Sequence, residues 1–182
     1  MDKLENDLKR INFKNIGILG GSFDPPHKGH VTISTEAKKK FTLEKVIWAI
    51  TKRSPLKSRS SLSLNKRIYL CKKISSKYKF INVRYYENLI RSNRTINLIN
   101  YLKKKFPGCE FYLIMGADNL INFHKWKRWR EISKKCKILI FDRKGYKSRS
   151  LKSKSYKKLG KKVINFIKFK KVNISSSQLR KI

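Results

Sequence analysis

Acidic residues are scarce in this sequence. Eleven Asp and Glu stand against 47 Lys and Arg, which gives the 182-residue chain a formal net charge of +36. Such an excess is typical of proteins that bind nucleic acids or phosphates. Here, however, the charge is spread along the whole chain and follows no repeat, zinc-finger or basic-helix pattern. It therefore favours a solvated basic surface, and no specific nucleic-acid partner is expected.

Long apolar runs are also missing, and cysteine is rare. No segment approaches the roughly 18 apolar residues that cross a bilayer, and the N-terminal MDKLENDLKR lacks the apolar core of a signal peptide. We therefore expect a cytoplasmic protein without membrane contact. The three cysteines, Cys71, Cys109 and Cys136, form no CxxC pair, which disfavours a disulfide framework or a zinc knuckle. Reduced, mostly buried thiols are the favoured interpretation.

Short, continuously apolar segments alternate along the chain with segments whose apolar residues recur three and four apart. The first kind predicts strands at 15–19, 45–50, 79–83, 110–115, 137–141 and 162–167. The second kind predicts helices near 29–40, 63–76, 95–106 and 119–133. This alternation predicts an α/β fold, a single Rossmann-like doubly wound domain with a mostly parallel sheet of five or six strands and helices on both faces. A ligand site is expected beyond the carboxyl ends of the strands.

The chain is long enough to bury one core, so a single domain over residues 1–182 is expected. One Lys/Ser-rich tract, RKGYKSRSLKSKSYKKLGKK at 143–162, interrupts the alternation before the last strand. Its composition predicts a basic surface loop. Contact with RNA or with a membrane surface is the alternative interpretation of this tract.

The loop GGSFDPPHKGH at 20–30 is the most unusual segment in the sequence. Gly20 and Gly21 are predicted to follow directly on the first strand, where their small size lets backbone N–H groups approach a phosphate. The loop matches neither the Walker A pattern nor GxGxxG. His27 and His30, three residues apart, are predicted at the first turn of the next helix. There the imidazoles and the helix N-terminus could face one anion.

Histidines at this spacing are also compatible with metal ligation, or with an ordinary capped helix start. A zinc site needs further ligands, and His124 together with the three scattered cysteines makes a poor set. No metal site formed by the protein is predicted.

The loop resembles the [T/S]FDPxHxGH signature of the nucleotidylyltransferase superfamily, whose members join a nucleoside triphosphate to a phosphate-bearing acceptor and release pyrophosphate. Its usual second half, ISSTxxR, is matched by ISSSQLR at 174–180. The segment GADNL at 116–120, followed by HKWKRW at 124–129, resembles the GADNLxxFHxWxxW run of bacterial nicotinate-mononucleotide adenylyltransferases. SPLK at 54–57 and RTIN at 94–97 stand where that family has a PPHK-type loop and an RTID-like segment, so Asn97 replaces an acid.

The resemblance implies transfer of the adenylyl group of ATP to nicotinate mononucleotide, giving deamido-NAD and pyrophosphate. It implies Mg²⁺ carried with ATP as the cofactor, and ATP and nicotinate mononucleotide as the partners. Nicotinamide mononucleotide and phosphopantetheine are alternative acceptors, and a basic nucleic-acid-binding protein on this scaffold is the alternative class. The oligomeric state stays open.

The resemblance also implies roles for individual residues. His27 and His30 are the catalytic residues, which hydrogen-bond the triphosphate. The predicted ATP- and phosphate-binding set is Gly20, Gly21, Ser22, Phe23, Ser175, Ser176, Ser177 and Arg180. The residues predicted to contact the nucleotide ribose are Gly116 and Asp118, and those predicted to bind the acceptor are Lys57, Thr95 and Trp126. The serines could instead form a plain helix N-cap, and Trp126, predicted to stack on the pyridine ring, could instead be a half-buried packing residue.

Overall fold

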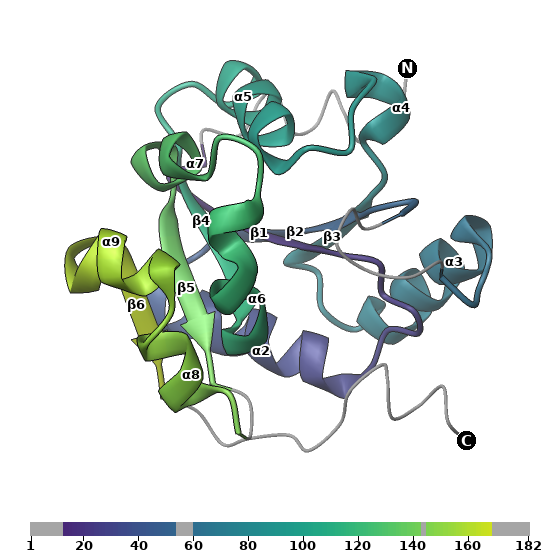
Figure 1. Ribbon diagram of the computed structural model, residues 1–182. Coiled ribbons are helices and arrows are strands. Elements are labelled where there is room, and N and C mark those ends of the chain that lie inside the picture. The colour runs from purple at the N-terminus through teal and green to yellow at the C-terminus, as the bar shows by residue number, and fades with distance from the viewer. Residues whose placement is uncertain (1–12, 54–59, 143–144, 169–182) are drawn as a thin grey trace.

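The computed structural model describes residues 13–53, 60–142 and 145–168. In this part of the chain, six parallel strands form one sheet in the order β3-β2-β1-β4-β5-β6 (Figure 1). The strands are β1 (Asn15–Gly21), β2 (Lys45–Ile50), β3 (Ile81–Arg84), β4 (Glu110–Gly116), β5 (Lys137–Phe141) and β6 (Ile164–Ile167). The predicted doubly wound α/β fold is confirmed.

Helices cover both faces of this sheet. The helices are α2 (Lys28–Phe41), α3 (Leu64–Ser75), α4 (Glu87–Ile90), α5 (Thr95–Lys105), α6 (Ala117–Asn122), the 3₁₀ turn η1 (Phe123–Lys125), α7 (Trp129–Lys135), α8 (Lys147–Leu151) and α9 (Lys154–Val163). Helices α2 and α3 pack on one face, while α5, α6 and α7 pack on the other. The chain therefore winds in opposite directions from β1 and from β4, which are neighbours in the sheet.

The central strands are buried on both faces, which explains why their sequences are apolar throughout rather than alternating. In β4, Phe111, Leu113 and Met115 join the core beneath α5, α6 and α7. Tyr112 and Ile114, between them in sequence, join the core beneath α2 and α3. Successive side chains of a strand point to opposite faces, so one short segment contributes to both cores.

The helix predicted over 119–133 is wrong as a single element, because the structure divides it into α6, η1 and α7. Arg128 adopts a left-handed conformation with φ of 54°, which no continuous α-helix contains. The break turns the chain so that Trp126 and Trp129 both pack edge-on against the buried ring of Phe123. The regular apolar spacing did not reveal this break, because apolar side chains on both sides of it pack into the same cluster.

The basic surface loop predicted over 143–162 is also wrong, since most of this tract forms α8 and α9. Its serines act as structural groups rather than as loop residues. Ser153 caps α9 by accepting a hydrogen bond from the Tyr156 N–H at 3.2 Å. The hydroxyl of buried Ser155 accepts from the His124 N–H at 2.9 Å, which ties α9 to η1. Tyr156 and Leu159 then pack against the core.

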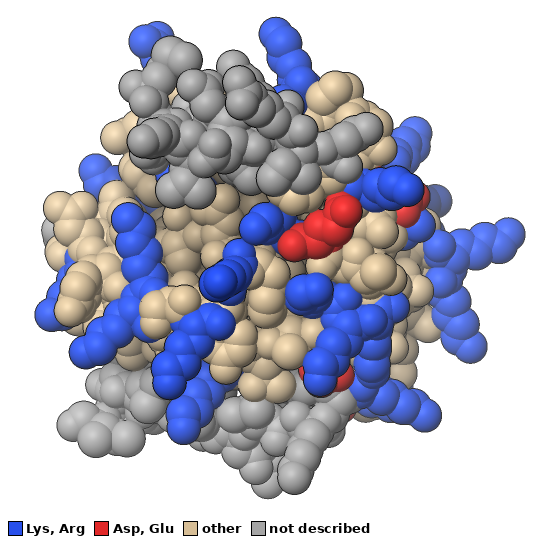
Figure 2. Space-filling model, turned by 180° about the vertical axis from the view of Figure 1, so that it is seen from behind, with Lys and Arg blue, Asp and Glu red and all other residues tan. Residues whose placement is uncertain are grey.

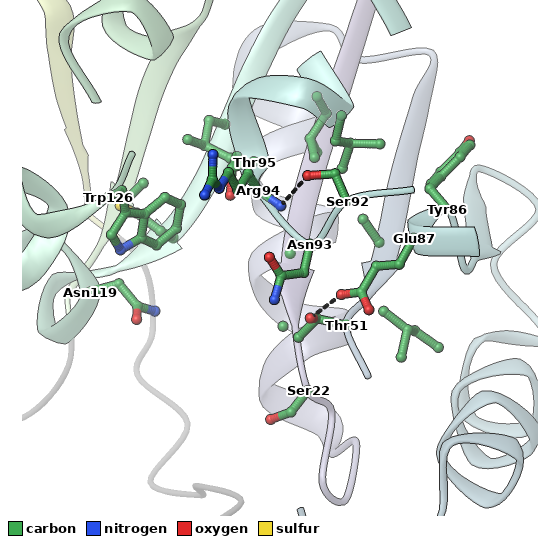
Figure 3. A pocket seen from close by; sticks show the side chains of 18 of the residues that line it. Ser22, Thr51, Tyr86, Glu87, Ser92, Asn93, Arg94, Thr95, Asn119 and Trp126 are labelled. Atoms are coloured by element: carbon green, nitrogen blue, oxygen red, sulfur yellow. Dashed lines mark hydrogen bonds between the residues drawn. The ribbon is translucent and has the colours of Figure 1, made fainter. Parts of the chain in front are cut away.

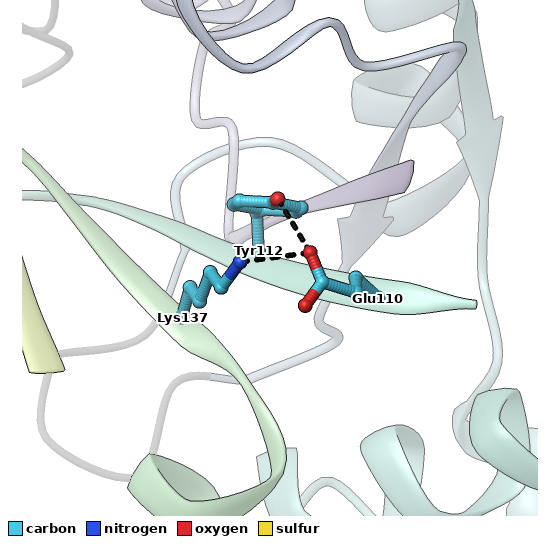
Figure 4. A network of polar contacts seen from close by, with 3 residues as sticks. All are labelled: Glu110, Tyr112 and Lys137. Carbon is cyan, nitrogen blue, oxygen red and sulfur yellow. Dashed lines mark hydrogen bonds and ion pairs between the residues drawn. The ribbon is translucent and has the colours of Figure 1, made fainter. Parts of the chain in front are cut away.

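A polar network joins the first residues of β4 and β5 (Figure 4). The Lys137 ammonium donates to Glu110 Oε2 at 2.8 Å, and the Tyr112 hydroxyl donates to the same oxygen at 2.9 Å. The hydrogen bond from Lys137, followed by that from Tyr112, lowers the pKa of the Glu110 carboxyl. The contribution of the Glu110 carboxylate to the free energy of unfolding is therefore present above the unfolded-state pKa and is lost as pH falls through the folded-state pKa. Both charged side chains are about half exposed, so this contribution amounts to a few tenths of a kcal/mol.

The predicted reduced, buried cysteines are confirmed, as Cys71, Cys109 and Cys136 are all free and buried. Burial raises the pKa of Cys71 and of Cys136 to about 12.

The thiolate is the form that reacts with iodoacetamide. We therefore expect both thiols to be alkylated about 10³-fold more slowly at pH 8 in the folded protein than in the urea-unfolded chain. Mass spectrometry of the alkylated protein checks this. Rapid labelling of either thiol in the folded state would contradict the packing described here.

Lys and Arg side chains project over much of the face seen from behind, with few acidic groups among them (Figure 2). The charge excess read from the composition is thus displayed on the surface, as expected for a solvated basic protein. No helix in the described part of the chain is both long and apolar enough to cross a membrane.

Candidate active site

A cavity of about 450 Å³ lies at the carboxyl ends of β1, β2 and β4 (Figure 3). Gly20 and Gly21 of β1, with Ser22 beyond it, form part of its wall. Ala49 and Ile50 of β2 form another part. Because winding reverses between β1 and β4, the cavity lies at the topological switch point, where α/β proteins bind their ligands. The cavity thus lies where the alternating pattern predicts a ligand site.

Gly20 and Gly21 were predicted to follow the first strand. In the structure they are instead the last two residues of β1, where they pair with Ala49 and Ile50. The prediction ended the strand at the last apolar side chain, whereas pairing requires only the backbone. A Cβ built on Gly20 would meet nothing within 4 Å, so packing does not demand glycine here. The absent side chain instead leaves open space at the cavity wall, which suits the close approach of a phosphate.

His27 and His30 meet at the start of α2, as the spacing predicts. Their ring centroids are 3.9 Å apart, and the backbone N–H of His27 donates to His30 Nδ1 at 3.1 Å. Because Nδ1 of His30 accepts this bond, the neutral imidazole carries its proton on Nε2. Neither ring is among the residues that line the cavity, although the neighbouring Gly20, Gly21 and Ser22 are. The structure therefore fixes the tautomer of His30 and places the ring next to the residues that line the cavity, rather than in the lining itself.

Phe23 supports His30 from the core side. Its buried ring lies 4.8 Å from the His30 ring and stacks on Trp48 at 5.1 Å. Trp48 is itself held by a hydrogen bond from its Nε1 to Ser34 Oγ at 2.9 Å. Phe23 was predicted to bind phosphate, but in the structure its side chain packs beneath the histidine. Any contact between Phe23 and a phosphate would come from its backbone.

Asp24, also part of the loop motif, is only 2% exposed. Its carboxylate accepts hydrogen bonds from the Ser61 N–H at 2.7 Å, from the Ser61 hydroxyl at 3.1 Å and from the Leu62 N–H at 3.0 Å. These contacts join the histidine loop to the segment that precedes α3. Asp24 thus orders the rim of the site through backbone groups far away in sequence.

Arg67 of α3 is a residue that the sequence interpretation missed. It is 1% exposed, and its guanidinium donates to four backbone carbonyl oxygens. The acceptors are the carbonyls of Leu62, Ser22, Thr51 and Lys52, at 2.6 to 3.1 Å. The guanidinium therefore holds the ends of β1 and β2 and the start of α3 together. The sequence signal that could have indicated its burial is its spacing, because Arg67 lies four residues before Cys71 on the buried side of the helix.

Glu87 also lines the cavity and was not predicted. Its carboxylate accepts a hydrogen bond from the Thr51 hydroxyl and another from the Lys52 N–H, the latter at 3.2 Å. Glu87 therefore fastens the start of α4 to the end of β2, and its carboxylate is engaged by groups of the protein.

The predicted ribose contacts Gly116 and Asp118 lie where β4 passes into α6. A Cβ on Gly116 would overlap Asp118 Oδ1, so glycine permits the observed position of that carboxylate.

We expect Gly116→Ala to displace Asp118 and, if Asp118 binds the ribose, to raise KM for ATP about tenfold. A change of this size corresponds to the loss of roughly one hydrogen bond to a charged group. Steady-state kinetics at varied ATP check this. An unchanged KM would contradict the predicted ribose contact.

Thr95 and Trp126, two of the predicted acceptor residues, both line the cavity. They come from α5 and from the residue after η1, and Figure 3 shows them near one another at one end of the site. Trp126 is half-buried and packs its ring against Phe123, as the alternative interpretation of a packing residue predicts. It also lines the cavity, so the two roles are compatible. The remaining predicted residues, Lys57, Ser175, Ser176, Ser177 and Arg180, lie outside the described residues.

A parallel sheet with a cavity at its switch point, beside a helix that begins at two histidines, is an arrangement typical of α/β proteins that bind nucleotides. The chain belongs to the cytidylyltransferase-like family, whose model matches residues 18–182. It is 58% identical to a protein of Pelagibacter ubique named "Probable nicotinate-nucleotide adenylyltransferase", over all of both chains. It is 41% identical to a protein of the same name from Agrobacterium fabrum, over 71% of this chain and 70% of that one.

Solved structures agree on the fold. Plasmodium falciparum nicotinic acid mononucleotide adenylyltransferase complexed with NaAD superposes with a TM-score of 0.74 at 23% identity. The match covers 92% of this chain and 83% of that one. The same enzyme complexed with APC gives a TM-score of 0.71 at 22% identity, with the same coverage.

Proposed function

We propose that the protein is a nicotinate-nucleotide adenylyltransferase, which transfers the adenylyl group of ATP to nicotinate mononucleotide and releases pyrophosphate. The structural observation that carries this proposal is the single cavity wall that links the glycine end of β1 with Thr95 and Trp126. A nucleotide chain and an aromatic ring could thus be bound in one continuous site. Its volume of about 450 Å³ lies within the 300 to 1,000 Å³ usual for small-molecule pockets.

The reaction is an in-line attack by the phosphate oxygen of the acceptor on the α-phosphorus of ATP. Pyrophosphate leaves as the new phosphoanhydride bond forms, and the protein supplies no nucleophile. Catalysis then depends on positioning and on donors that stabilise charge growing on the nonbridging and leaving oxygens. His30 fits this role because its Nδ1 accepts the His27 N–H, which places the proton of the neutral imidazole on Nε2, where it can be donated.

Mg²⁺ is proposed to enter with ATP on the phosphate oxygens, where it would neutralise charge. The described residues include no group of three His, Cys, Asp or Glu side chains that could hold a metal ion. The carboxylate of Asp24 is occupied by Ser61 and Leu62.

At the other end of the cavity, Trp126 would stack on the pyridine ring while Thr95 hydrogen-bonds its substituent. Trp126 and Thr95 belong to different elements, so two separate parts of the chain would contribute to this end of the site.

Pyrophosphate release from ATP and Mg²⁺ tests the proposal when nicotinate mononucleotide, nicotinamide mononucleotide and phosphopantetheine are supplied in parallel. We expect the highest kcat/KM with nicotinate mononucleotide and deamido-NAD as the product identified by mass. A preference for phosphopantetheine, or no turnover with any acceptor by the folded protein, would overturn the proposed function.

A further inference from the structure

Among the described residues, four charged side chains line the cavity, and three of them are cations. They are Glu87, Arg94, Lys125 and Lys127. The Glu87 carboxylate already accepts hydrogen bonds from Thr51 and Lys52. The cavity is therefore suited to a ligand that brings negative charge, and the cations decide where that charge is placed.

Arg94 has its backbone held firmly at the start of α5. Its N–H donates to Ser92 Oγ at 3.1 Å, and its carbonyl accepts from the Asn97 N–H at 3.0 Å. The Asn97 side chain donates to the same Ser92 oxygen at 3.0 Å. A residue whose main chain is fixed in this way loses less freedom when its side chain binds a ligand.

The Arg94 side chain, in contrast, is exposed and carries an uncompensated charge within the described part of the chain. The described residues place no carboxylate within ion-pair distance of its guanidinium. The residue three positions further along the helix, which would be its nearest neighbour on α5, is Asn97, an amide rather than an acid. The guanidinium therefore remains available to a ligand carboxylate.

Arg94 also lies at the acceptor end of the cavity. In Figure 3 it is drawn with Thr95 and Trp126, while Ser22, beside the glycine end of β1, lies at the opposite end. If Trp126 stacks on the pyridine ring, the carboxyl or carboxamide group attached to that ring would contact the start of α5. The triphosphate would occupy the other end.

We infer that Arg94 is a specificity-determining residue, which binds the carboxylate that distinguishes nicotinate from nicotinamide. The inference rests on the proposed function. A guanidinium presents parallel N–H donors to the two oxygens of a carboxylate, whereas a carboxamide offers one uncharged oxygen and an N–H₂ group that repels them. Loss of such a charged hydrogen-bonded pair changes affinity by about 10- to 100-fold.

Calorimetric binding of each mononucleotide without ATP tests this role, because no reaction occurs without the second substrate. We expect wild-type protein to bind nicotinate mononucleotide about 10- to 100-fold more tightly than nicotinamide mononucleotide. Arg94→Gln should lose most of this ratio by weakening only the nicotinate compound, and Arg94→Lys should keep part of it. Lys104→Gln, which removes an exposed cation from the same helix outside the cavity lining, is the matched control and should keep the full ratio.

Three results would overturn the inference: an undiminished ratio in Arg94→Gln, equal weakening of both ligands, or a wild-type chain that binds neither mononucleotide. A wild-type chain that shows the ratio but releases no pyrophosphate would instead overturn the proposed function. The two failures are thus separate, since one is measured by binding and the other by turnover.

Discussion

His30→Ala is expected to lower kcat by about 10²- to 10³-fold while KM for ATP changes little. The side chain presents Nε2–H as a donor because Nδ1 accepts the His27 N–H at 3.1 Å. A donor that meets charge developing in the transition state contributes mainly to kcat, and loss of one such donor typically has an effect of this size. Steady-state kinetics with ATP and nicotinate mononucleotide measure it.

The same substitution removes a helix cap, so stability must be measured alongside activity. Loss of the His27–His30 contact at the start of α2 should destabilise the protein by about 1 kcal/mol, which thermal unfolding detects. Lys28→Ala, an exposed change in the same turn, is the control and should retain normal kcat. A folded His30→Ala protein with normal kcat would show that the imidazole does not act on the transition state.

The histidine pair could be predicted from sequence because its signal is local. Two prolines, three glycines and an HxxH spacing define a loop and a helix start within eleven residues. The strands were equally accessible, since a parallel sheet buried on both faces leaves short apolar segments such as KVIWAI and KILIF. In both cases the residues that create the structure are adjacent along the chain.

The tract over 143–162 could not be read in this way, because its polar residues are used by distant partners. Ser155 is buried since it accepts a hydrogen bond from His124, 31 positions away. Composition alone assigns serine and lysine to solvent, and only the packing of Tyr156 and Leu159 on the core reverses that assignment. Arg67 is a similar case, as its four acceptors are backbone carbonyls, which carry no sequence signal.

Arg67→Met is expected to lower the free energy of unfolding by about 3 kcal/mol or more. Two effects oppose one another at this site. Removing a buried guanidinium relieves a desolvation penalty of several kcal/mol. It also breaks four hydrogen bonds from a charged donor, each contributing about 1.5 to 3 kcal/mol, and leaves the carbonyls of Ser22, Thr51, Lys52 and Leu62 without that donor. The second effect is larger, so the net change is destabilising.

Urea unfolding measures this loss, with Arg130→Met as the control, because Arg130 is an exposed arginine on α7 and its replacement should stay within about 0.5 kcal/mol. Arg67→Lys should also be destabilised, since a single ammonium has three donors and cannot match the planar fork. Ser22 and Thr51 line the cavity, so any Arg67 variant that remains folded should bind its substrates more weakly. Wild-type stability in Arg67→Met would mean that the ends of β1 and β2 are held in place without the guanidinium, and that the cavity owes its shape to the sheet alone.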